Sequence, residues 1–236
     1  MESDVLAAVR RELQQSIDEK TRESAQRFFK EVVKFHGVKS AAVKKIATKY
    51  FRDIKGRDKK EIFSLCEDLL QANFGEEAFI AFEWSYSLRR KYEPEDFAVF
   101  ERWVDLYVDN WAKCDTLCNH TLGTFVETYP QFIENLAIWA RAENRWLRRA
   151  SAVTLILPAR KGLFLKEVFE ISDILLTDRD DMVQKGYGWL LKEASRKHPS
   201  EVFDYVMRWK AKMPRTALRY AIEKMPQEMR KEAMAR

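Results

Sequence analysis

The sequence predicts an all-α protein built as a solenoid of stacked helical units. Glycine and proline, with seven and six residues, are scarce in a chain of 236, whereas the helix formers Ala, Leu, Glu, Lys and Arg are abundant. Apolar residues recur three and four positions apart along nearly the whole chain, and no stretch alternates as a strand does. A weak self-similarity with a period of about 35 residues indicates stacked helical pairs.

The helical pattern can be followed along the chain from one segment to the next. Apolar spacing predicts helices at Phe28–Phe35, Ile62–Leu70 and Phe97–Val108, in that order. Polar turns separate these and later helices, at "KFHGVKS", "IKGRDK", "RKYEPED", "ETYPQF", "PARKGL", "TDRDD" and "RKHPSE". Because no linker or change of composition divides the chain, we expect a single domain over residues 1–236.

Prolines mark the repeat. Pro94 and Pro130 are 36 residues apart, Pro199 follows after 69, close to twice that spacing, and each opens an amphipathic segment as proline does at the first helical position. The intermediate unit is expected to open near Leu165, where "KGLFLKEVF" begins without a proline. A tryptophan follows each proline after nine or ten residues: Trp103, Trp139 and Trp209. Two helices per unit are typical of HEAT-like repeats.

A row of functional side chains follows from this register. Asp115, Arg149 and Lys185 are 34 and 36 residues apart, in the second helices of successive units. Second helices usually line the concave side of a solenoid, so we expect these three residues to be neighbours in a concave, basic groove. Trp111 precedes Asp115 by one turn and Trp189 follows Lys185 by one turn, which places both indoles beside the row.

The charge is concentrated in one segment. The whole chain carries a formal charge of +5, but nine basic residues lie between Lys39 and Lys60 against only Asp53 and Asp58. Lys45, Lys49 and Arg52 share one side of a helix. Such a field suits a polyanion, although a solvated lysine-rich helix would have the same pattern.

The row combines groups that attract opposite charges. Arg148, Arg149 and Lys185 can neutralise phosphates, whereas an indole face or a carboxylate stabilises a cation. Alkylated DNA matches both, because a purine alkylated on a ring nitrogen is cationic within an anionic backbone. Each residue also has a structural interpretation: tryptophan in the core, Asp115 at the positive end of a helix dipole, and Arg149 paired with an acid such as Glu143.

The cysteines do not predict a metal site. Cys114, Cys118 and His120 lie close together, but zinc usually requires four ligands and the other histidines are far away in the sequence. We expect both cysteines to pack as small apolar side chains, and we predict no metal and no cofactor.

Compartment and assembly follow from composition. Three cysteines and no leader segment favour a reducing cytoplasm, with association to the nucleoid when the protein is bound to DNA. The longest apolar run, Ala152–Leu157, is too short to cross a membrane, so we expect a soluble protein and a monomer.

Three motifs carry a family resemblance. "W-x-x-x-D" at Trp111–Asp115, "W-L-x-R" at Trp146–Arg149 and "Q-K-x-x-G-W-x-L-(K/R)-E" at Gln184–Glu193 resemble the signature segments of the AlkD-like DNA glycosylases. These are HEAT-like repeat enzymes that excise cationic alkylpurines. "RFFKEVVKFHGV" at Arg27–Val38 resembles that family's second helix and its Gly-Val turn.

The resemblance implies a role for each matched residue. Asp115 would be the catalytic carboxylate, Trp111 and Trp189 would pack against the deoxyribose, and Arg149 would hold a phosphate. Phe28 stands where the family often has tyrosine. The sequence departs from the family at Ala112-Lys113-Cys114, where Asp-Ser-Val is more usual, and in the missing proline after Gly37-Val38.

The expected function is therefore that of a glycosylase. It would release 3-methyladenine and 7-methylguanine from duplex DNA by hydrolysis of the N-glycosidic bond, without a deep pocket for a flipped base. We expect the duplex to contact six side chains: Arg149, Arg148, Lys185, Lys45, Lys49 and Phe28. Two alternatives are a catalytically silent DNA-binding protein and a protein-binding scaffold.

Overall fold

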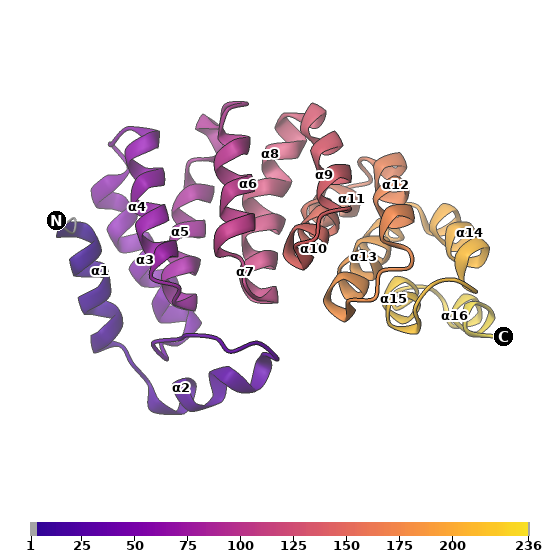
Figure 1. The fold of residues 1–236 in the computed structure, drawn as a ribbon, viewed down its shortest axis with the longest axis horizontal. Helices are drawn as coiled ribbons and strands as arrows, with labels where there is room; N and C mark the ends of the chain where they lie inside the picture. The colour runs from indigo at the N-terminus through magenta and orange to yellow at the C-terminus, as the bar shows by residue number, and fades with distance from the viewer. Residues whose placement is uncertain (1–3, 236) are drawn as a thin grey trace. The chain divides into compact units, whose positions relative to one another are not determined.

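The computed structural model describes residues 4–235, and they are helical almost throughout (Figure 1). Within this range the backbone forms no strand, and its only β-type pairings are two isolated bridges, Ile17 with Val38 and Lys34 with Phe74. The predicted all-α fold is confirmed. Every helix in residues 4–235 is also too short or too polar to cross a lipid bilayer.

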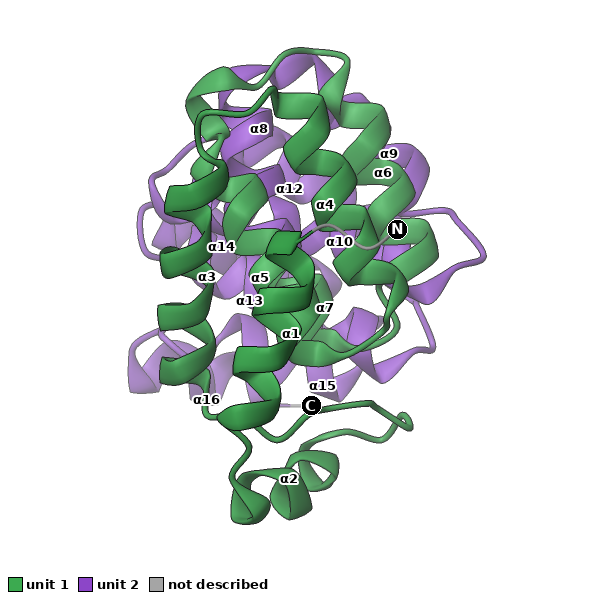
Figure 2. Ribbon diagram, turned by 90° about the vertical axis from the view of Figure 1, so that its left-hand side faces the viewer, with its two compact units in different colours: residues 1–116 green, residues 117–236 purple. Residues whose placement is uncertain are grey.

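The chain forms two compact units that divide after Thr116 (Figure 2). The prediction of a single domain stays a prediction, and each unit is described by itself. The first unit contains α1 (Asp4–Gln15), α2 (Glu19–Ala25), the 3₁₀ helix η1 (Gln26–Phe28), α3 (Ser40–Ile54), α4 (Lys59–Gln71), α5 (Gly75–Ser87), the 3₁₀ helix η2 (Arg89–Lys91), α6 (Asp96–Tyr107) and α7 (Trp111–Thr116).

Helix α5 is the centre of the first unit. It packs against α3, α4 and α7, while α1 packs on α3 and α6 on α4. Trp84 of α5 is fully buried and its indole N–H donates to the carbonyl of Ala47 at 2.9 Å, so its single polar group is satisfied. Trp103 of α6 is fully buried against Phe63 and Phe100. Helix α2 has no buried residue and lies across one end of these helices (Figure 1).

The helix predicted at Phe28–Phe35 is wrong, because only Phe28 is helical, as the last residue of η1. The Gln26 side chain accepts from the Val33 N–H at 3.2 Å and donates to the Glu31 carbonyl at 2.8 Å, which holds this segment in a loop. Further on, the buried Glu76 carboxylate accepts the N–H groups of residues 36, 37 and 38 at 2.8–3.0 Å. These contacts supply partners for backbone groups that a helix would otherwise satisfy.

The second unit begins with a π-helical turn, η3 (Leu117–Leu122). Its other helices are α8 (Gly123–Thr128), the 3₁₀ helix η4 (Pro130–Phe132), α9 (Ile133–Trp139), α10 (Arg145–Thr154), α11 (Ile156–Arg160), α12 (Leu165–Leu175), α13 (Asp181–Ala194), α14 (Pro199–Trp209), α15 (Arg215–Ala221) and α16 (Gln227–Met234). Helix α13 is its centre, packed against α10, α11, α12 and α15. Tyr187 of α13 is fully buried and its hydroxyl donates to the carbonyl of Leu176 at 3.0 Å.

The predicted repeat starts agree with the observed helices. Pro199 is the first residue of α14 and Pro130 the first of η4, while α6 begins two residues after Pro94. Helix α12 begins at Leu165, the position expected for the unit without a proline. The repeat is therefore a property of the folded chain as well as of its sequence.

Candidate nucleic-acid interface

Helices α7, α10 and α13 begin in the same way. Asn110, Asn144 and Asp180 each accept, through a side-chain oxygen, the N–H of the residue two positions on, at 3.0, 2.9 and 2.8 Å. Such a cap satisfies one of the free N–H groups of the first turn and fixes where the helix starts. The caps are 34 and 36 residues apart, the spacing of the predicted row.

Asp115, Arg149 and Lys185 hold equivalent positions in these helices, because each lies five residues after its cap. The predicted register is therefore present in the local structure of each helix. Helix α7 belongs to the first unit, and α10 and α13 belong to the second. The closeness of Asp115 to Arg149 stays a prediction.

Asp115 is half-buried in the second turn of α7. The cap is Asn110, and the helical bonds begin where Cys114 N–H donates to the Asn110 carbonyl at 3.1 Å. Asp115 therefore lies beyond the unsatisfied N–H groups at the positive end of the helix. The position does not support the interpretation of Asp115 as a partner of the helix dipole.

Trp111 is half-buried and is held by the loop of the first unit. Its indole N–H donates to the Phe28 carbonyl at 3.2 Å. One face of the indole stacks on Phe29, with ring centroids 5.3 Å apart and planes at 19°, and Phe29 in turn contacts Phe35 at 5.4 Å. The Phe28 side chain is 71% exposed. The structure thus brings Phe28 and Trp111 together, through the Phe28 backbone.

Two of the residues that depart from the family motif face the interior. Lys113 and Cys114 are buried, and the Lys113 ammonium pairs with Asp109 at 2.9 Å and donates to the side chain of Asn73. A buried lysine requires such partners. The Lys113 contacts connect α7 to the turn between α4 and α5. Lysine at this position, a departure from the family motif, therefore changes the contacts that hold the helix of Asp115 in place.

A cavity of about 330 Å³ lies in the first unit, with Trp111 in its wall. Its walls are largely apolar, with Phe29, Phe35, Phe79 and Phe82 as the other buried or half-buried rings, and they also include the polar side chains of Glu76, Asn110 and Lys113. The expectation of a site without a deep pocket for a flipped base stays a prediction, because the cavity shows only a hollow beside Trp111 in the first unit. The cavity could not be predicted from the sequence, because its rings come from η1, the following loop, α5 and α7, and only folding brings these segments together.

Lys45 and Lys49 are exposed in a separate shallow groove along α3 and do not line the aromatic cavity. Lys49 pairs with Glu12 at 2.5 Å, and this hydrogen bond lowers the pKa of Glu12 and raises the pKa of Lys49. Among the described residues Lys45 has no ion-pair partner. Of the two lysines, Lys45 is the one available to a phosphate without a competing carboxylate.

Arg149 in α10 is 5% exposed, and its guanidinium donates to the Met182 carbonyl of α13. Gly186 lies one turn after Met182 in α13, and a Cβ atom built there would be in ordinary contact with the Arg149 stem, 3.4 Å away. Arg149 therefore joins α10 to α13 in addition to any contact with a ligand.

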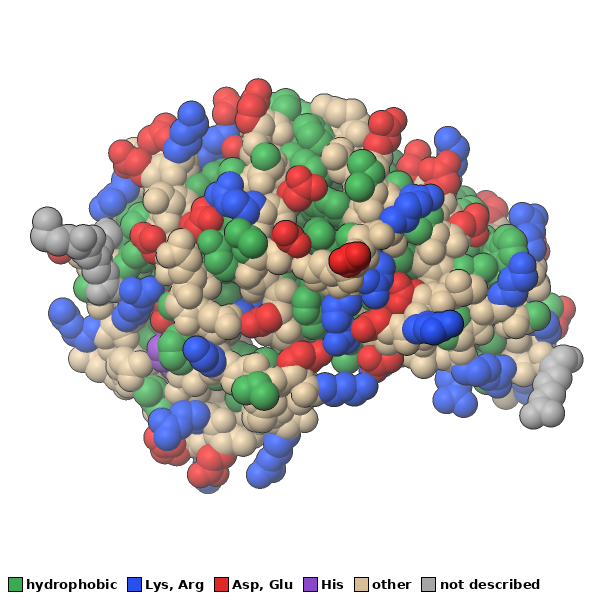
Figure 3. All heavy atoms as spheres, in the orientation of Figure 1, with side chains coloured by type: hydrophobic (Ala, Val, Ile, Leu, Met, Phe, Trp, Pro, Cys, Tyr) green, Lys and Arg blue, Asp and Glu red, His purple; other side chains and the backbone are tan. Residues whose placement is uncertain are grey.

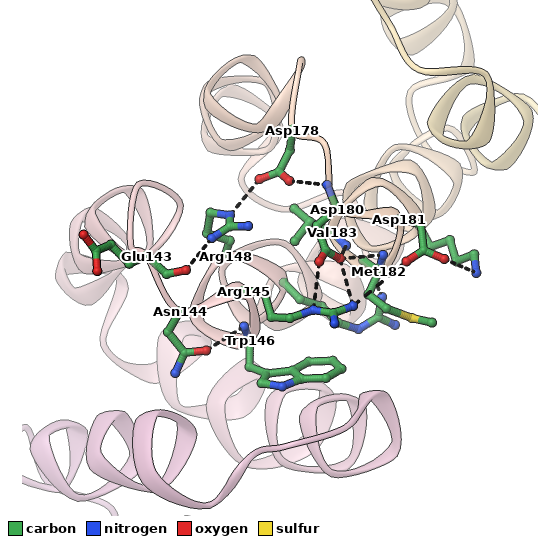
Figure 4. A network of polar contacts seen from close by, with 12 residues as sticks. Glu143, Asn144, Arg145, Trp146, Arg148, Asp178, Asp180, Asp181, Met182 and Val183 are labelled. Carbon is green, nitrogen blue, oxygen red and sulfur yellow. Dashed lines mark hydrogen bonds and ion pairs between the residues drawn. The ribbon is translucent and has the colours of Figure 1, made fainter. Parts of the chain in front are cut away.

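Arg145 and Arg148, near the start of α10, form a network with acids (Figure 4). Arg148 pairs with Asp178 at 2.7 Å and donates to the carbonyls of residues 142 and 143 at 2.9 and 2.7 Å. Arg145 pairs with Asp180 at 2.8 Å, the carboxylate that caps α13. The network fixes the starts of α10 and α13, and a phosphate at Arg148 would have to displace Asp178.

Lys185 and Trp189 lie one turn apart on α13, and both are half-buried. Lys185 pairs with Asp181 at 3.3 Å, within the same helix. A partly solvent-accessible pair of this kind within one helix is weak, about 0.3–0.5 kcal/mol, so Lys185 can exchange Asp181 for a phosphate at little cost. Arg149 lies in α10, Lys185 and Trp189 lie in α13, and these two helices pack against each other.

The surface charge is mixed on one face of the molecule, and the cysteines lie in its interior. On the face drawn in Figure 3, basic and acidic side chains are interspersed. Cys66, Cys114 and Cys118 are all buried thiols, and burial raises the pKa of Cys66 far above its ordinary value. Within residues 4–235, His, Cys, Asp and Glu side chains form no group of three or more that could hold a metal ion.

Some residues that shape the site were missed by the sequence reasoning. Asn110, Asn144 and Asp180 were detectable, because each is a capping residue type directly before a helical segment and all three follow the repeat period. The Lys113–Asp109 pair was also detectable as a spacing of four residues. Phe79 and Phe82 carried no signal beyond ordinary apolar spacing.

Comparison with known proteins places this geometry in a family. The family described as "DNA alkylation repair enzyme" matches residues 9–225. A solved structure described as a predicted DNA alkylation repair enzyme from Enterococcus faecalis superposes with a TM-score of 0.80 at 17% identity, covering 90% of this chain and 98% of that one, which shows a shared fold. The comparison with curated proteins gave no match. Because the family match spans most of the sequence, this chain belongs to the DNA alkylation repair enzyme family.

Proposed function

We propose that the protein is a DNA glycosylase that releases N3- and N7-alkylated purines, such as 3-methyladenine and 7-methylguanine, from duplex DNA. The observation that carries this proposal is the common position of Asp115, Arg149 and Lys185 after three equivalent helix caps. One carboxylate and two cations repeated in register suit a charged lesion within an anionic backbone.

Hydrolysis of the N-glycosidic bond of an alkylated purine requires few catalytic groups from the protein. An alkylated purine carries a positive charge, so it leaves as a neutral base when it takes the electron pair of the N-glycosidic bond. The sugar becomes an oxocarbenium-like cation, which the Asp115 carboxylate stabilises. A water molecule then adds to C1′, and Asp115 accepts the proton that this water loses.

The surrounding residues would position the substrate. The exposed part of the Trp111 indole and the indole of Trp189 would lie against the deoxyribose and contribute cation–π stabilisation, about 0.5–2 kcal/mol each. Arg149 and Lys185 would bind phosphates, which holds the duplex without reading its sequence. Arg148 would contribute when Asp178 releases it, and Lys45 and Lys49 would add a contact along α3.

The test is a base-release assay on methylated duplex DNA. Asp115→Asn keeps the size of the side chain but removes its charge, so we expect release of free base to fall by about 10²-fold or more, the usual contribution of an acid–base residue. Affinity for the duplex should stay nearly unchanged. Asp105→Asn, which neutralises an exposed carboxylate on α6, is the matched control and should leave release unchanged. Full activity of Asp115→Asn would remove this residue from the mechanism.

One observation favours a second function, that of a DNA-binding protein without catalysis. The stack of Phe29 on Trp111 occupies an indole face that would otherwise be open to a sugar. If the wild-type protein binds methylated duplex DNA and releases no base, this second function replaces the first.

A further inference from the structure

We propose that Arg215 and Arg219 of α15 bind phosphates of the duplex and continue the predicted row by one helix. The proposal rests on the proposed function for its ligand, DNA, but not on catalysis by Asp115. It assigns a binding surface to a part of the chain that the predicted row does not include.

Helix α15 begins in the same way as α10 and α13. In each helix the N–H of the fourth residue after the cap donates to the carbonyl of the cap, at 3.2 Å for Asn144, 2.9 Å for Asp180 and 3.0 Å for Pro214. These caps are 36 and 34 residues apart. Arg219 lies five residues after Pro214, which is the position that Lys185 holds in α13.

Close packing fixes α15 beside α13. A Cβ atom at Gly188 of α13 would lie 2.7 Å from the Ala217 carbonyl oxygen and 2.7 Å from the Tyr220 Cβ, so the two backbones are in direct contact. Tyr220 also faces the Lys192 ammonium of α13, which lies 5.5 Å from the ring centroid. Packed helices are about 8–10 Å apart, and α15 therefore extends the row by one such step.

The two arginines carry charges that the fold does not compensate. Arg215 and Arg219 are one turn apart and exposed, and α15 contains no acidic residue. Within residues 4–235 neither arginine has an ion-pair partner, whereas Lys185 of α13 has Asp181 at the same spacing of four residues. Like charges four residues apart destabilise a helix. An external anion would remove this repulsion.

A shallow groove between α15 and α16 adds a third guanidinium. Arg219 lines the groove from α15 and Arg230 lines it from α16. Arg230 is exposed, and it too has no ion-pair partner in the part of the chain that the structure describes. The acid in the lining is Glu223, and its carboxylate pairs with Lys192 at 3.1 Å and with Lys224 at 3.6 Å. Its charge is therefore offset.

The segment around the groove is basic. Residues 208–235 contain three acids: Glu223, Glu228 and Glu232. Glu228 pairs with Lys231 at 3.3 Å, and Glu232 is exposed outside the groove lining. The same residues contain eight bases: Arg208, Lys210, Lys212, Arg215, Arg219, Lys224, Arg230 and Lys231. Arginine is suited to a phosphate because its planar guanidinium matches two phosphate oxygens at once.

The test is a titration of unmodified duplex DNA at several salt concentrations. Arg219→Gln should reduce the slope of log K against log salt by about 0.9, the value of one phosphate contact, and adding Arg215→Gln should reduce it further. Arg208→Gln is the matched control, because it removes the same charge from an exposed position of α14, the first helix of its pair. It should leave the slope unchanged. Thermal midpoints of all these variants should equal or exceed that of the wild type.

Several results would overturn the proposal. They are an unchanged slope in the doubly substituted protein, an equal fall in Arg208→Gln, and failure of the wild type to bind the duplex. A fall in slope accompanied by a lower thermal midpoint would assign the arginines to the fold instead. Inorganic phosphate added at constant ionic strength should preserve the difference between wild type and Arg219→Gln, and loss of that difference would identify a site for free phosphate.

The outcome is separate from that of the glycosylase assay. If the slope falls as expected but methylated DNA releases no base, the glycosylase function fails and the α15 contact stands. If base is released and the slope is unchanged, the reverse holds.

Discussion

Among the glycines of the second unit, Gly188 has the least room for a side chain. A Cβ atom at this position would lie 2.7 Å from the carbonyl oxygen of Ala217 and 2.7 Å from the Cβ of Tyr220, both on α15. Real Cβ atoms do not approach other atoms this closely, and a backbone oxygen cannot rotate away. Gly188→Ala must therefore push α15 away from α13.

Gly186 in the same helix provides a matched control. A Cβ atom there would meet the Arg149 side chain at 3.4 and 3.6 Å and the Arg149 carbonyl oxygen at 3.8 Å, which is ordinary contact. Both substitutions replace glycine inside a helix, and each gains about 1 kcal/mol of helix propensity. The gain cancels in the comparison, so the difference in unfolding free energy equals the overpacking cost at Gly188, about 1–3 kcal/mol.

Thermal unfolding followed by far-UV circular dichroism measures this difference. For a chain of this size about 2–4 °C of midpoint corresponds to 1 kcal/mol, so Gly188→Ala should melt roughly 2–12 °C below Gly186→Ala. Gly186→Ala should equal or exceed the wild type. Equal midpoints for the two variants would show that α13 and α15 do not pack as closely as the structure indicates.

The remaining predictions concern charge. Burial raises the pKa of Glu193, but hydrogen bonds from Arg196 and Arg160 at 2.6 and 2.7 Å more than offset this, and the pKa lies below its ordinary value. The ionised carboxylate therefore stabilises the fold above the unfolded pKa of about 4.3, and this contribution is lost as the pH falls below that value. Urea midpoints of wild type should drop more steeply in that range than those of Glu193→Gln, and parallel curves would contradict the assignment. In duplex-binding titrations at several salt concentrations, Lys45→Ala should reduce the slope of log K against log salt by about 0.9, the value of one phosphate contact. Glu12→Gln should increase the same slope because it releases Lys49, and unchanged slopes in both variants would exclude the α3 groove from DNA binding.

Local features of the sequence determined the helices and their register. Amphipathic spacing and capping depend on residues within one or two turns, so the start of α12 at Leu165 could be predicted without its proline. The same locality fixed Asp115, Arg149 and Lys185 at equivalent helical positions. The motif resemblance and the family match agree on this part of the chain.

Tertiary structure decided the features that depend on distant partners. Phe28–Phe35 has helical spacing, yet the helix does not form. The Gln26 side chain satisfies backbone groups of this loop. The Glu76 carboxylate, 38 to 40 residues away from its partners, satisfies the backbone N–H groups that follow the loop. The cavity beside Trp111 likewise needs rings from several separate segments. Arg148 meets Asp178 only because α10 packs near the start of α13.

The physical reason for this difference between sequence and tertiary structure is the range, along the chain, over which each interaction acts. Helix propensity, capping and periodicity act between neighbours along the chain, and the sequence by itself determined an all-α repeat with its candidate residues in register. Burial, ion pairing and cavities depend on which surfaces meet in space, so only the folded structure decided that Arg148 and Arg149 join helices and that an aromatic cavity stands beside Trp111.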